Sequence, residues 1–462
     1  MKIKAFKIKD FDKLEKYFFA LFLLVSFVSY LLWSLNIPFG EAPDEAMRYQ
    51  IPDFIYRYGY LPVGDDPEII NPVWGISYAF TPITTYIVQA FFMKITSFFT
   101  TDSWALIMTA RIVNILFSVI TLWICILISQ LIFKKNYTAK WLFLFAVAFL
   151  PQYAFVSSYV NMDVLAVLSS AIIVYAWISG LKTDWDYKSC IVLAVGMSVC
   201  LLSYYNAYGF LLCSVLLYFG SMLCCNKNLK QIKFFKKTAL IVFVVLLLSA
   251  WWFIRNFFLY DGDILGLAAS NECADIHADA AHKLDALDIP KNKGQSLWYM
   301  LKDRMWLFLV ARSFIGLLGH ANVALSTWVY LFYALFFVAS FVGCLISFKK
   351  FFPKIKSKLD EHSKKTILFS ITMIIAVITP FLISMYYSYT ADFQPQGRYS
   401  IPCLIPLMFF SSVGFNSLFS KLLPQKFESK LKNISVVLVM TIMLFFIFKI
   451  LTGTIIPVYQ GA

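Results

Sequence analysis

The chain has 462 residues, of which 60% are apolar and only 14% are charged, and its mean hydropathy is +0.73. So little polar surface excludes a soluble globular protein of this size, and the solvent of the chain must be largely lipid. The formal charge of +14 would suit a nucleic-acid partner, but the basic residues stand in short clusters between apolar runs. That pattern is typical of membrane topology and argues against nucleic acid.

Runs of about 20 apolar residues recur along the chain, and each is long enough to cross a hydrocarbon layer of roughly 30 Å. We therefore predict an all-α polytopic membrane protein in which residues 1–462 form a single transmembrane domain. Two apolar stretches, Tyr78–Phe99 and Trp306–Gly319, are ambiguous and either cross the bilayer or lie along its outer surface. The other runs predict eleven spans, at Tyr17–Ile37, Trp104–Phe133, Trp141–Val156, Val164–Ser179, Ser189–Tyr204, Tyr208–Cys225, Ala239–Tyr260, Ala324–Phe348, Ile367–Tyr387, Ile401–Phe419 and Ile434–Leu451.

Lysine clusters distinguish eleven spans from thirteen, because short loops rich in lysine stay in the cytoplasm. With eleven spans, 27 of the 33 lysines lie on the cytoplasmic side. If both ambiguous stretches crossed, three of the clusters would move outside. We therefore predict eleven spans and two interfacial or re-entrant segments, with juxtamembrane helices in a first outer loop at 38–103 and a second large outer loop at 260–323.

All seven arginines fall in outer loops or at the outer ends of spans in this topology. Cations on that side oppose the positive-inside bias, so we expect some of these arginines to have a functional role. Guanidinium groups suit phosphate and carboxylate ligands, whereas arginines at a membrane surface also extend toward lipid phosphates. The second reading is as strong as the first for Arg57, Arg111, Arg304 and Arg312; the others are Arg48, Arg255 and Arg398.

The first outer loop contains two adjacent carboxylates, Asp44 and Glu45, directly after the first span. Carboxylates at a membrane surface are costly unless they are solvated or paired. An aspartate in this place could accept a proton from an attacking hydroxyl or hold a cation. From spacing alone, an ordinary solvated acid of a loop is the favoured interpretation.

The second large loop carries an acidic segment that could bind a divalent metal. If the segment is helical, Asp275, Asp279 and His282 share one face, and Glu272 and His277 lie near them. Carboxylate and imidazole are suitable ligands. The spacing is generic, however, and favours a solvated amphipathic helix.

Polar residues also gather at three span ends on the outer side. Each set alone could be an interfacial anchor within an aromatic belt. Their shared side of the membrane favours one common site. The sets are Asn161 and Asp163; Arg255, Asn256, Tyr260 and Asp263; and Gln396, Arg398 and Tyr399.

The order of these motifs resembles a group of predicted bacterial membrane glycosyltransferases. The motifs are Pro-Asp-Glu at 43–45, Val-Asn-Met-Asp at 160–163, Trp-Trp with Arg-Asn at 251–256, Tyr-Asp-Gly-Asp at 260–263 and Gln-Gly-Arg-Tyr at 396–399. That group is similar to the C-type glycosyltransferase (GT-C) superfamily, which includes protein O-mannosyltransferases and lipid A aminoarabinose transferase. The resemblance covers about Pro43 to Pro406.

The resemblance implies a GT-C-like fold and a polyprenyl-phosphate-sugar donor. An acidic residue of the first outer loop lies at the reaction centre in that superfamily, so Asp44 is expected to be the base and Glu45 its partner. Arg255, Arg398 and Arg48 are expected to bind the donor phosphate, and the other polar residues at the span ends to support them. The implied enzyme lies in the bacterial cytoplasmic membrane, faces outward, and transfers sugar to a glycan, lipid or protein of the cell envelope.

The motifs also depart from the family pattern. The group usually has histidine where Arg48 stands, and Tyr-Gly-Asp-Pro where this chain has Tyr-Asp-Gly-Asp. Two other functions fit the composition: a polymerase or ligase of lipid-linked polysaccharide, and a flippase or transporter of lipid-linked sugar. A transporter would place acids near the midplane, whereas the ionisable candidates here lie at the outer margin. The identities of sugar and acceptor, the need for metal and the oligomeric state stay open.

Overall fold

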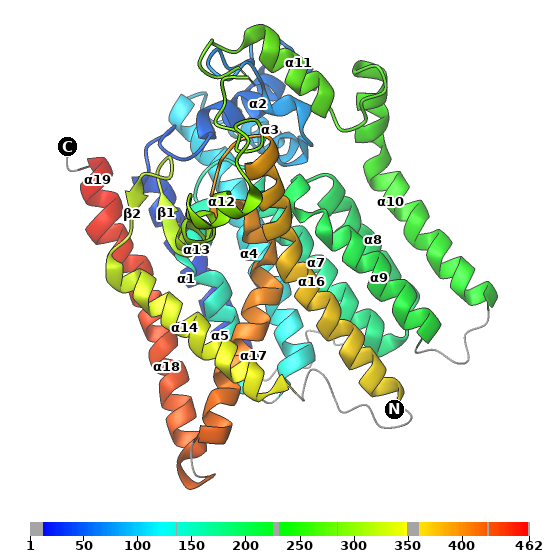
Figure 1. Cartoon of the computed structure of the whole chain (residues 1–462), viewed down its shortest axis with the longest axis vertical. Coiled ribbons are helices and arrows are strands. Elements are labelled where there is room, and N and C mark those ends of the chain that lie inside the picture. Colours follow the sequence, from blue (N-terminus) through cyan, green and yellow to red (C-terminus); the bar gives the residue numbers. More distant parts are fainter. Residues whose placement is uncertain are drawn as a thin grey trace.

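The computed structural model describes residues 13–134, 136–224, 231–283, 285–348, 360–422 and 425–460, and nearly all of its regular structure is helical. Within these ranges nine helical segments are long and apolar enough to cross a membrane. They run side by side, and short helices gather at one end, which we call the capped end (Figure 1). The nine segments are built on α1 (Lys13–Asn36), α4 (Ser103–Phe133), α7 (Asp163–Thr183), α9 (Gly209–Cys224), α10 (Gln231–Leu259), α14 (Thr327–Ile346), α16 (Glu361–Thr390), α17 (Leu404–Leu422) and α18 (Gln425–Ile450).

All eleven predicted spans are helical, but two are shorter than the rest. One is α8 (Tyr187–Leu201). The other is divided into α5 (Tyr137–Ala148) and α6 (Pro151–Val156). Proline disfavours the helical conformation in the residue before it, and Leu150 accordingly has a ψ of 122°. After α6 the chain turns at 157–162, where its residues are buried, and α7 begins at Asp163.

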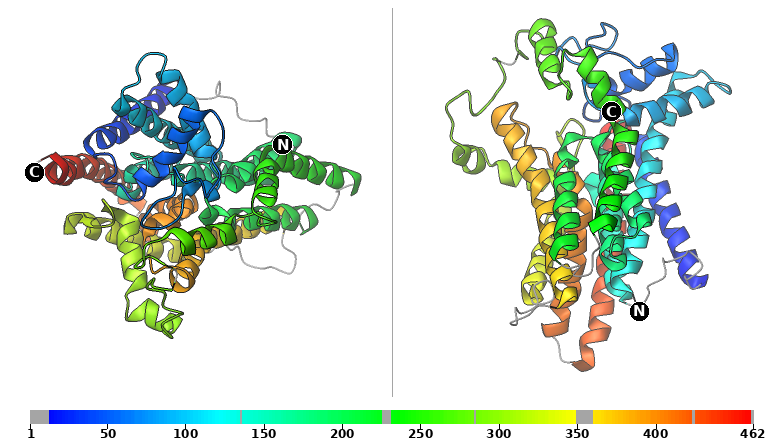
Figure 2. Two further views of the ribbon diagram at one scale, coloured as in Figure 1. Left: turned by 90° about the horizontal axis from the view of Figure 1, so that it is seen from above. Right: turned by 90° about the vertical axis from the view of Figure 1, so that its right-hand side faces the viewer.

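The two ambiguous stretches form short helices. Helix α3 (Thr84–Thr96) has 13 residues and α13 (Trp306–Gly316) has 11. At a rise of 1.5 Å per residue they are about 20 and 17 Å long, against a hydrocarbon layer of roughly 30 Å. Helix α3 lies with α2 (Glu45–Tyr58) and α11 (Leu267–His277) at the capped end (Figures 1 and 2).

The remaining short elements lie in the connections. One is a two-stranded antiparallel hairpin, in which Leu317 pairs with Ala324 and Leu318 with Val323. The elements are η2 (Tyr78–Phe80), η3 (Tyr205–Ala207), α12 (Leu297–Lys302), β1 (Leu317–Leu318), β2 (Val323–Ala324), η4 (Gly397–Cys403), η5 (Leu451–Ile455) and α19 (Ile456–Gln460).

Helix α7 is at the centre of the bundle. Most of its side chains are buried, and it contacts α4, α8, α9 and α17. In contrast, α10, α14, α16 and α18 expose many apolar side chains, as expected of helices that face lipid. Both α7 and the η4–α17 segment begin at the capped end, so their first residues lie beneath α2.

Helices α14 and α17 touch through their backbones. A Cβ added to Gly343 would overlap the carbonyl oxygen of Gly414, and one added to Gly414 would overlap that of Ser340. Small residues allow this approach, which replaces the hydrophobic driving force that helices lack inside lipid. The contact matters for the site because α17 continues directly from η4.

Replacing Gly343 with leucine should separate α14 from α17. Overpacking of this kind typically costs about 1–3 kcal/mol, so we expect a lower midpoint of thermal unfolding in detergent. The matched control is Val342→Leu, because Val342 is the next residue of α14 and its side chain is exposed toward lipid. Equal unfolding midpoints for the two variants would contradict the contact.

Candidate active site

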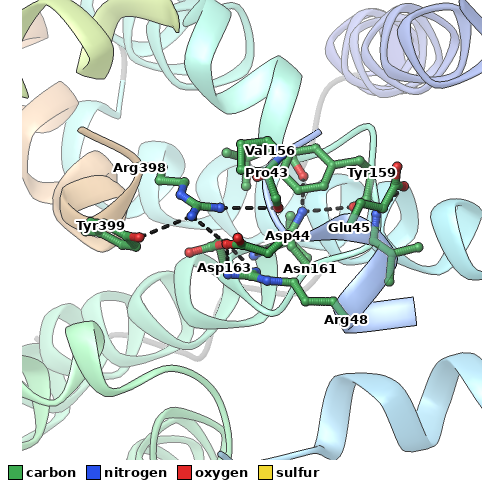
Figure 3. Close-up of polar contacts among 12 residues, drawn as sticks. Pro43, Asp44, Glu45, Arg48, Val156, Tyr159, Asn161, Asp163, Arg398 and Tyr399 are labelled. Atoms are coloured by element: carbon green, nitrogen blue, oxygen red, sulfur yellow. Dashed lines mark hydrogen bonds and ion pairs between the residues drawn. The ribbon is translucent and has the colours of Figure 1, made fainter. Parts of the chain in front are cut away.

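The candidate site begins where the chain enters α2. Asp44 lies directly before this helix in the left-handed region, with φ 60° and ψ 9°, which aspartate tolerates better than most residues. Its carboxylate makes no capping hydrogen bond to α2. It faces the bundle instead, and its Oδ2 accepts a hydrogen bond from Nη2 of Arg398 at 2.7 Å (Figure 3).

Arg48 follows Asp44 by one helical turn, so both side chains lie on one face of α2. Its Nη2 is 3.6 Å from Oδ2 of Asp44, and its Nη1 donates to Oδ2 of Asp163 at 2.9 Å. Asp163 is the first residue of α7, where the helix dipole favours an anion. The four side chains form a row of alternating charge, Asp163–Arg48–Asp44–Arg398, which we call the charge row.

The position of Arg398 depends on the residue before it. Gly397 has no room for a side chain, because a Cβ there would overlap the backbone of α13. The N–H of Gly397 donates to Oγ of Ser313 at 2.6 Å, which fixes the start of η4 against α13. From this position Arg398 also donates to the carbonyl of Pro43 at 3.4 Å and to the hydroxyl of Tyr399 at 3.1 Å.

One member of the charge row is open to its surroundings. The side chain of Asp44 is 32% exposed, whereas those of Arg398, Arg48 and Asp163 are 4%, 0% and 0% exposed. Burial by itself would raise the pKa of Asp44, but the charges of Arg398 and Arg48 outweigh it and hold that pKa well below its usual range. Asp44 is therefore an ionised carboxylate that a ligand can reach.

Aromatic rings cover the charge row. The guanidinium of Arg48 lies 4.7 Å from the ring centroid of Tyr78, and that of Arg398 lies 4.9 Å from that of Tyr399. Burial, followed by the nearby charge of Asp44, raises the pKa of Tyr78 well above its usual value, so its hydroxyl stays protonated. Nothing in the sequence distinguishes Tyr78, because a tyrosine in this loop looks like any interfacial anchor.

Glu45 is directed away from the charge row and binds Arg111. Its Oε1 and Oε2 accept hydrogen bonds from Nε and Nη2 of Arg111 at 2.8 and 2.7 Å, and both side chains are fully buried. Its carboxylate also accepts from the backbone N–H groups of Val160 at 3.0 Å and Gly40 at 3.1 Å. We expected Glu45 to assist Asp44, but its oxygens are already engaged in joining α2 to α4.

Arg111 uses all five of its N–H donors. Besides Glu45, it donates to the carbonyls of Ser34, Ile37 and Pro38 at 2.6, 2.7 and 3.2 Å. It therefore closes the turn between α1 and α2 and does not extend toward lipid phosphates. The sequence does not show whether a lone arginine in an apolar run is buried. A buried, paired arginine and one that extends toward lipid phosphates look the same in it.

Two other expected supporting residues shape the backbone around the row. The side-chain amide of Asn161 donates to the carbonyls of Val156 and Tyr159 at 2.7 and 2.8 Å, which holds the turn that leads into α7. Gln396 contributes its carbonyl, which accepts from the N–H of Tyr399 at 3.3 Å. Both therefore set the directions of Asp163 and Arg398.

The third set of expected residues lies apart from the charge row. Nη2 of Arg255 donates to the carbonyl of Pro62 at 2.6 Å, and the hydroxyl of Tyr260 accepts from the N–H of Gly64 at 2.9 Å. Asn256 donates to a carbonyl of the loop that follows, and Asp263 accepts four backbone N–H groups at the start of α11. Within the described ranges none of these four residues bonds to the charge row. Arg255 and Tyr260 join the two large loops, and Asn256 and Asp263 shape the loop after α10.

The acidic segment of the second loop is not the continuous helix that we considered. Helix α11 ends at His277, and Ala278 is extended, with φ −65° and ψ 148°. Asp279 begins a tight turn and binds the His282 ring at 2.7 Å, so the shared helical face with Asp275 does not form. In the part of the chain that the structure describes, no three potential ligands converge on a metal position.

The remaining arginines have local partners outside the charge row. They are Arg57 with Asp53 and Glu68, Arg304 with Asp288, and Arg312 over the ring of Tyr330.

Comparison with known proteins identifies the architecture. No protein-family model and no curated protein matches the sequence. ArnT from Cupriavidus metallidurans, bound to undecaprenyl phosphate, is similar in structure with a TM-score of 0.53 at 15% identity, over 90% of this chain and 63% of that one. The archaeal oligosaccharyltransferase AglB from Archaeoglobus fulgidus, in complex with an inhibitory peptide and a dolichol phosphate, gives a TM-score of 0.56 at 12% identity, over 94% of this chain and 56% of that one.

The chain has the fold of the C-type glycosyltransferases. The apo form of the A. fulgidus oligosaccharyltransferase agrees, with a TM-score of 0.58 at 13% identity over 96% of this chain. At these identities the likeness is one of fold, and the chain spans less than two thirds of the length of these C-type proteins. The resemblance drawn from the motifs is confirmed at the level of the fold.

Replacing Glu45 with glutamine should destabilise the C-type fold strongly. The change leaves Arg111 buried without its counter-ion, and breaking a buried pair typically costs 3–5 kcal/mol. The midpoint of thermal unfolding would measure the loss. Glu68→Gln is the control, because Glu68 pairs with Arg57 in an exposed position and should change the midpoint little. Similar midpoints in the two variants would mean that the buried pair is not needed.

The lowered pKa of Asp44 predicts how stability depends on pH. A carboxylate whose pKa falls on folding stabilises the fold fully above its ordinary pKa of about 4, and that contribution disappears as pH drops further. The difference in unfolding midpoint between the wild-type protein and Asp44→Asn should thus stay constant from pH 8 to pH 5 and shrink only below about pH 4. A difference that already narrows between pH 7 and pH 5 would contradict the pairing with Arg398.

Proposed function

We propose that this protein is a membrane glycosyltransferase that moves a sugar from a polyprenyl-phosphate carrier to a glycan, lipid or protein of the cell envelope. The capped end would face outward from the bacterial cytoplasmic membrane, as the lysine distribution predicts. The observation that carries the proposal is the pairing of a reachable carboxylate, Asp44, with a buried arginine, Arg398, in a C-type fold. Solved proteins with this fold hold undecaprenyl phosphate or dolichol phosphate.

The chemistry is a single displacement with inversion at the anomeric carbon. The acceptor hydroxyl attacks that carbon, its proton passes to Asp44, and the bond from the carbon to the phosphate oxygen breaks. Charge gathers on the leaving polyprenyl phosphate, where preplaced guanidinium groups stabilise it most. Nε of Arg398 and both Nε and Nη2 of Arg48 have no hydrogen-bond partner among the described residues. These N–H groups would donate to the phosphate oxygens.

Donor binding would also prepare the base. In the free protein the charge of Arg398 lowers the pKa of Asp44 and makes it a weak proton acceptor. A phosphate that shares the guanidinium of Arg398 would reduce this effect and raise the proton affinity of Asp44. Asp44 would therefore become a useful base only once the donor is in place.

A divalent metal has no step in this proposal. Asp44 is the reachable carboxylate of the row, and Asp163 is held by Arg48. The described residues offer no group of three potential ligands at either place. The arginines supply the positive charge that the leaving phosphate needs.

The decisive variant is Asp44→Asn, which keeps the shape and tolerates the left-handed backbone of this position. Loss of a general base typically lowers a rate by about 10²–10⁴-fold. We expect a loss of this size when transfer from a polyprenyl-phosphate-sugar donor is measured in proteoliposomes.

Asp65→Asn is the control, because Asp65 is an exposed acid of the same outer loop and should not change the rate. Unfolding midpoints of both variants would establish that they are folded. A folded Asp44→Asn variant that transfers sugar at the wild-type rate would refute the proposed base. Mass spectrometry of envelope glycans with and without the protein would identify the sugar and acceptor.

A further inference from the structure

We infer that the segment 297–316, made of α12 and α13 and here called the finger, is embedded in the lipid leaflet at the capped end. It belongs to the second large loop, yet its surface is unlike that of a loop in water. Figure 2 shows this yellow-green part of the chain at the flank of the bundle, beside the spans instead of over their ends. The inference concerns how the protein meets the membrane and does not rest on the proposed reaction.

The depth of the finger follows from its contacts with α16. This helix has 30 residues and is thus about 45 Å long, so a hydrocarbon layer of roughly 30 Å covers its central two thirds. Phe381 lies about 30 Å from the start of α16, which places it roughly 7 Å inside the outer boundary of that layer. The ring of Phe314 in α13 is 5.9 Å from the ring of Phe381. The inner face of α13 therefore packs at hydrocarbon depth.

The start of the finger lies at the level of the membrane interface. The hydroxyl of Tyr389, in the last turn of α16, donates to the carbonyl of Gln295, just before α12. Tyr386 and Tyr387, exposed on the same part of α16, are residues of the type that marks this interface. Trp298 of α12 is 70% exposed, which suits a ring that lies in the same aromatic belt.

The outer face of the finger is apolar at the start of α13, whereas Lys302 and Asp303 are exposed where α12 ends. Leu307 and Phe308 of α13 are 60% and 57% exposed, and Met305 before them is 51% exposed. The opposite side of α13, with Trp306 and Val310, is buried against the bundle. This two-sided pattern is typical of a helix that lies in the membrane interface. In water the same residues would form a contiguous solvent-exposed apolar patch.

Lipid is the occupant that the surroundings of the finger favour. Its exposed face continues into the exposed apolar faces of α14 and α16, which are membrane spans. On α14 this face begins at Trp328, two residues after the connection from α13 ends, and continues through Leu331 and Leu335. A surface continuous with lipid-facing spans and lying at their depth is covered by the same lipid.

The test is ¹⁹F NMR of the whole protein in lipid nanodiscs, with its 12 tryptophans replaced by 5-fluorotryptophan. The variant Trp298→Phe assigns the Trp298 signal by its disappearance. A doxyl spin label near the lipid headgroups should broaden this signal until it is lost, whereas a gadolinium chelate in water should leave it visible. A new signal from Phe308→Trp should respond more strongly to a label deeper in the acyl chain.

Trp74 is the matched control, because it is partly exposed but contacts His282 in the loops of the cap, with ring centroids 4.4 Å apart. Its signal, assigned with Trp74→Phe, should respond to gadolinium and not to doxyl lipid. If gadolinium removes the Trp298 signal, the finger lies in water and the inference is wrong. It is equally wrong if neither agent affects that signal, because a second copy or another protein would then cover the finger.

Discussion

The structure depends on one constraint, which is that a charge removed from water needs a partner. Six charged side chains meet at the capped end, and pairing them joins segments that lie far apart in the sequence. The Glu45–Arg111 pair attaches α2 to α4, and the charge row attaches α2 to α7 and η4. These pairs require specific positions of the segments that carry them, because a buried charge left unpaired is costly. The positions of α2 and η4 over the bundle follow from this requirement.

The same constraint separates two neighbouring acids into different roles. Successive residues at the start of a helix point in directions about 100° apart, so Asp44 and Glu45 cannot face the same partner. Glu45 is fully buried and engaged by four donor groups, which leaves it no capacity for a ligand. Asp44 has a single close ion pair and remains partly exposed. Of the two acids, only Asp44 can therefore contact a ligand or accept a proton from it.

Much of the fold could be predicted because crossing a membrane requires long apolar runs, and these are visible in a sequence. All eleven predicted spans are helical, and the two ambiguous stretches form the short helices α3 and α13. Asp44 and Arg398 could also be predicted to meet, since both fall at outer span ends and paired charges are favoured there. The end of the bundle at which a residue lies is thus predictable from the order of the apolar runs.

The direction in which each side chain points could not be predicted from apolar runs and lysine clusters. Hydropathy places Arg111 and Arg255 on the outer side, but it does not tell how each helix is rotated about its axis. In the structure Arg111 points into the bundle and pairs with Glu45, while Arg255 points to the first outer loop. The end of α11 at His277 was equally hidden, because no proline or glycine marks it. Each of these outcomes depends on packing between distant segments.

The long separation between Asp44 and Arg398 has a consequence for biosynthesis. The two residues are 354 positions apart, so the ribosome has made most of the chain before the second one exists. Until then Asp44 lacks its close partner, although Arg48 can already pair with Asp163. Completion of the charge row is consequently a late event in membrane assembly, and a chain truncated before η4 would present an unsealed group of charges that quality-control proteases can recognise.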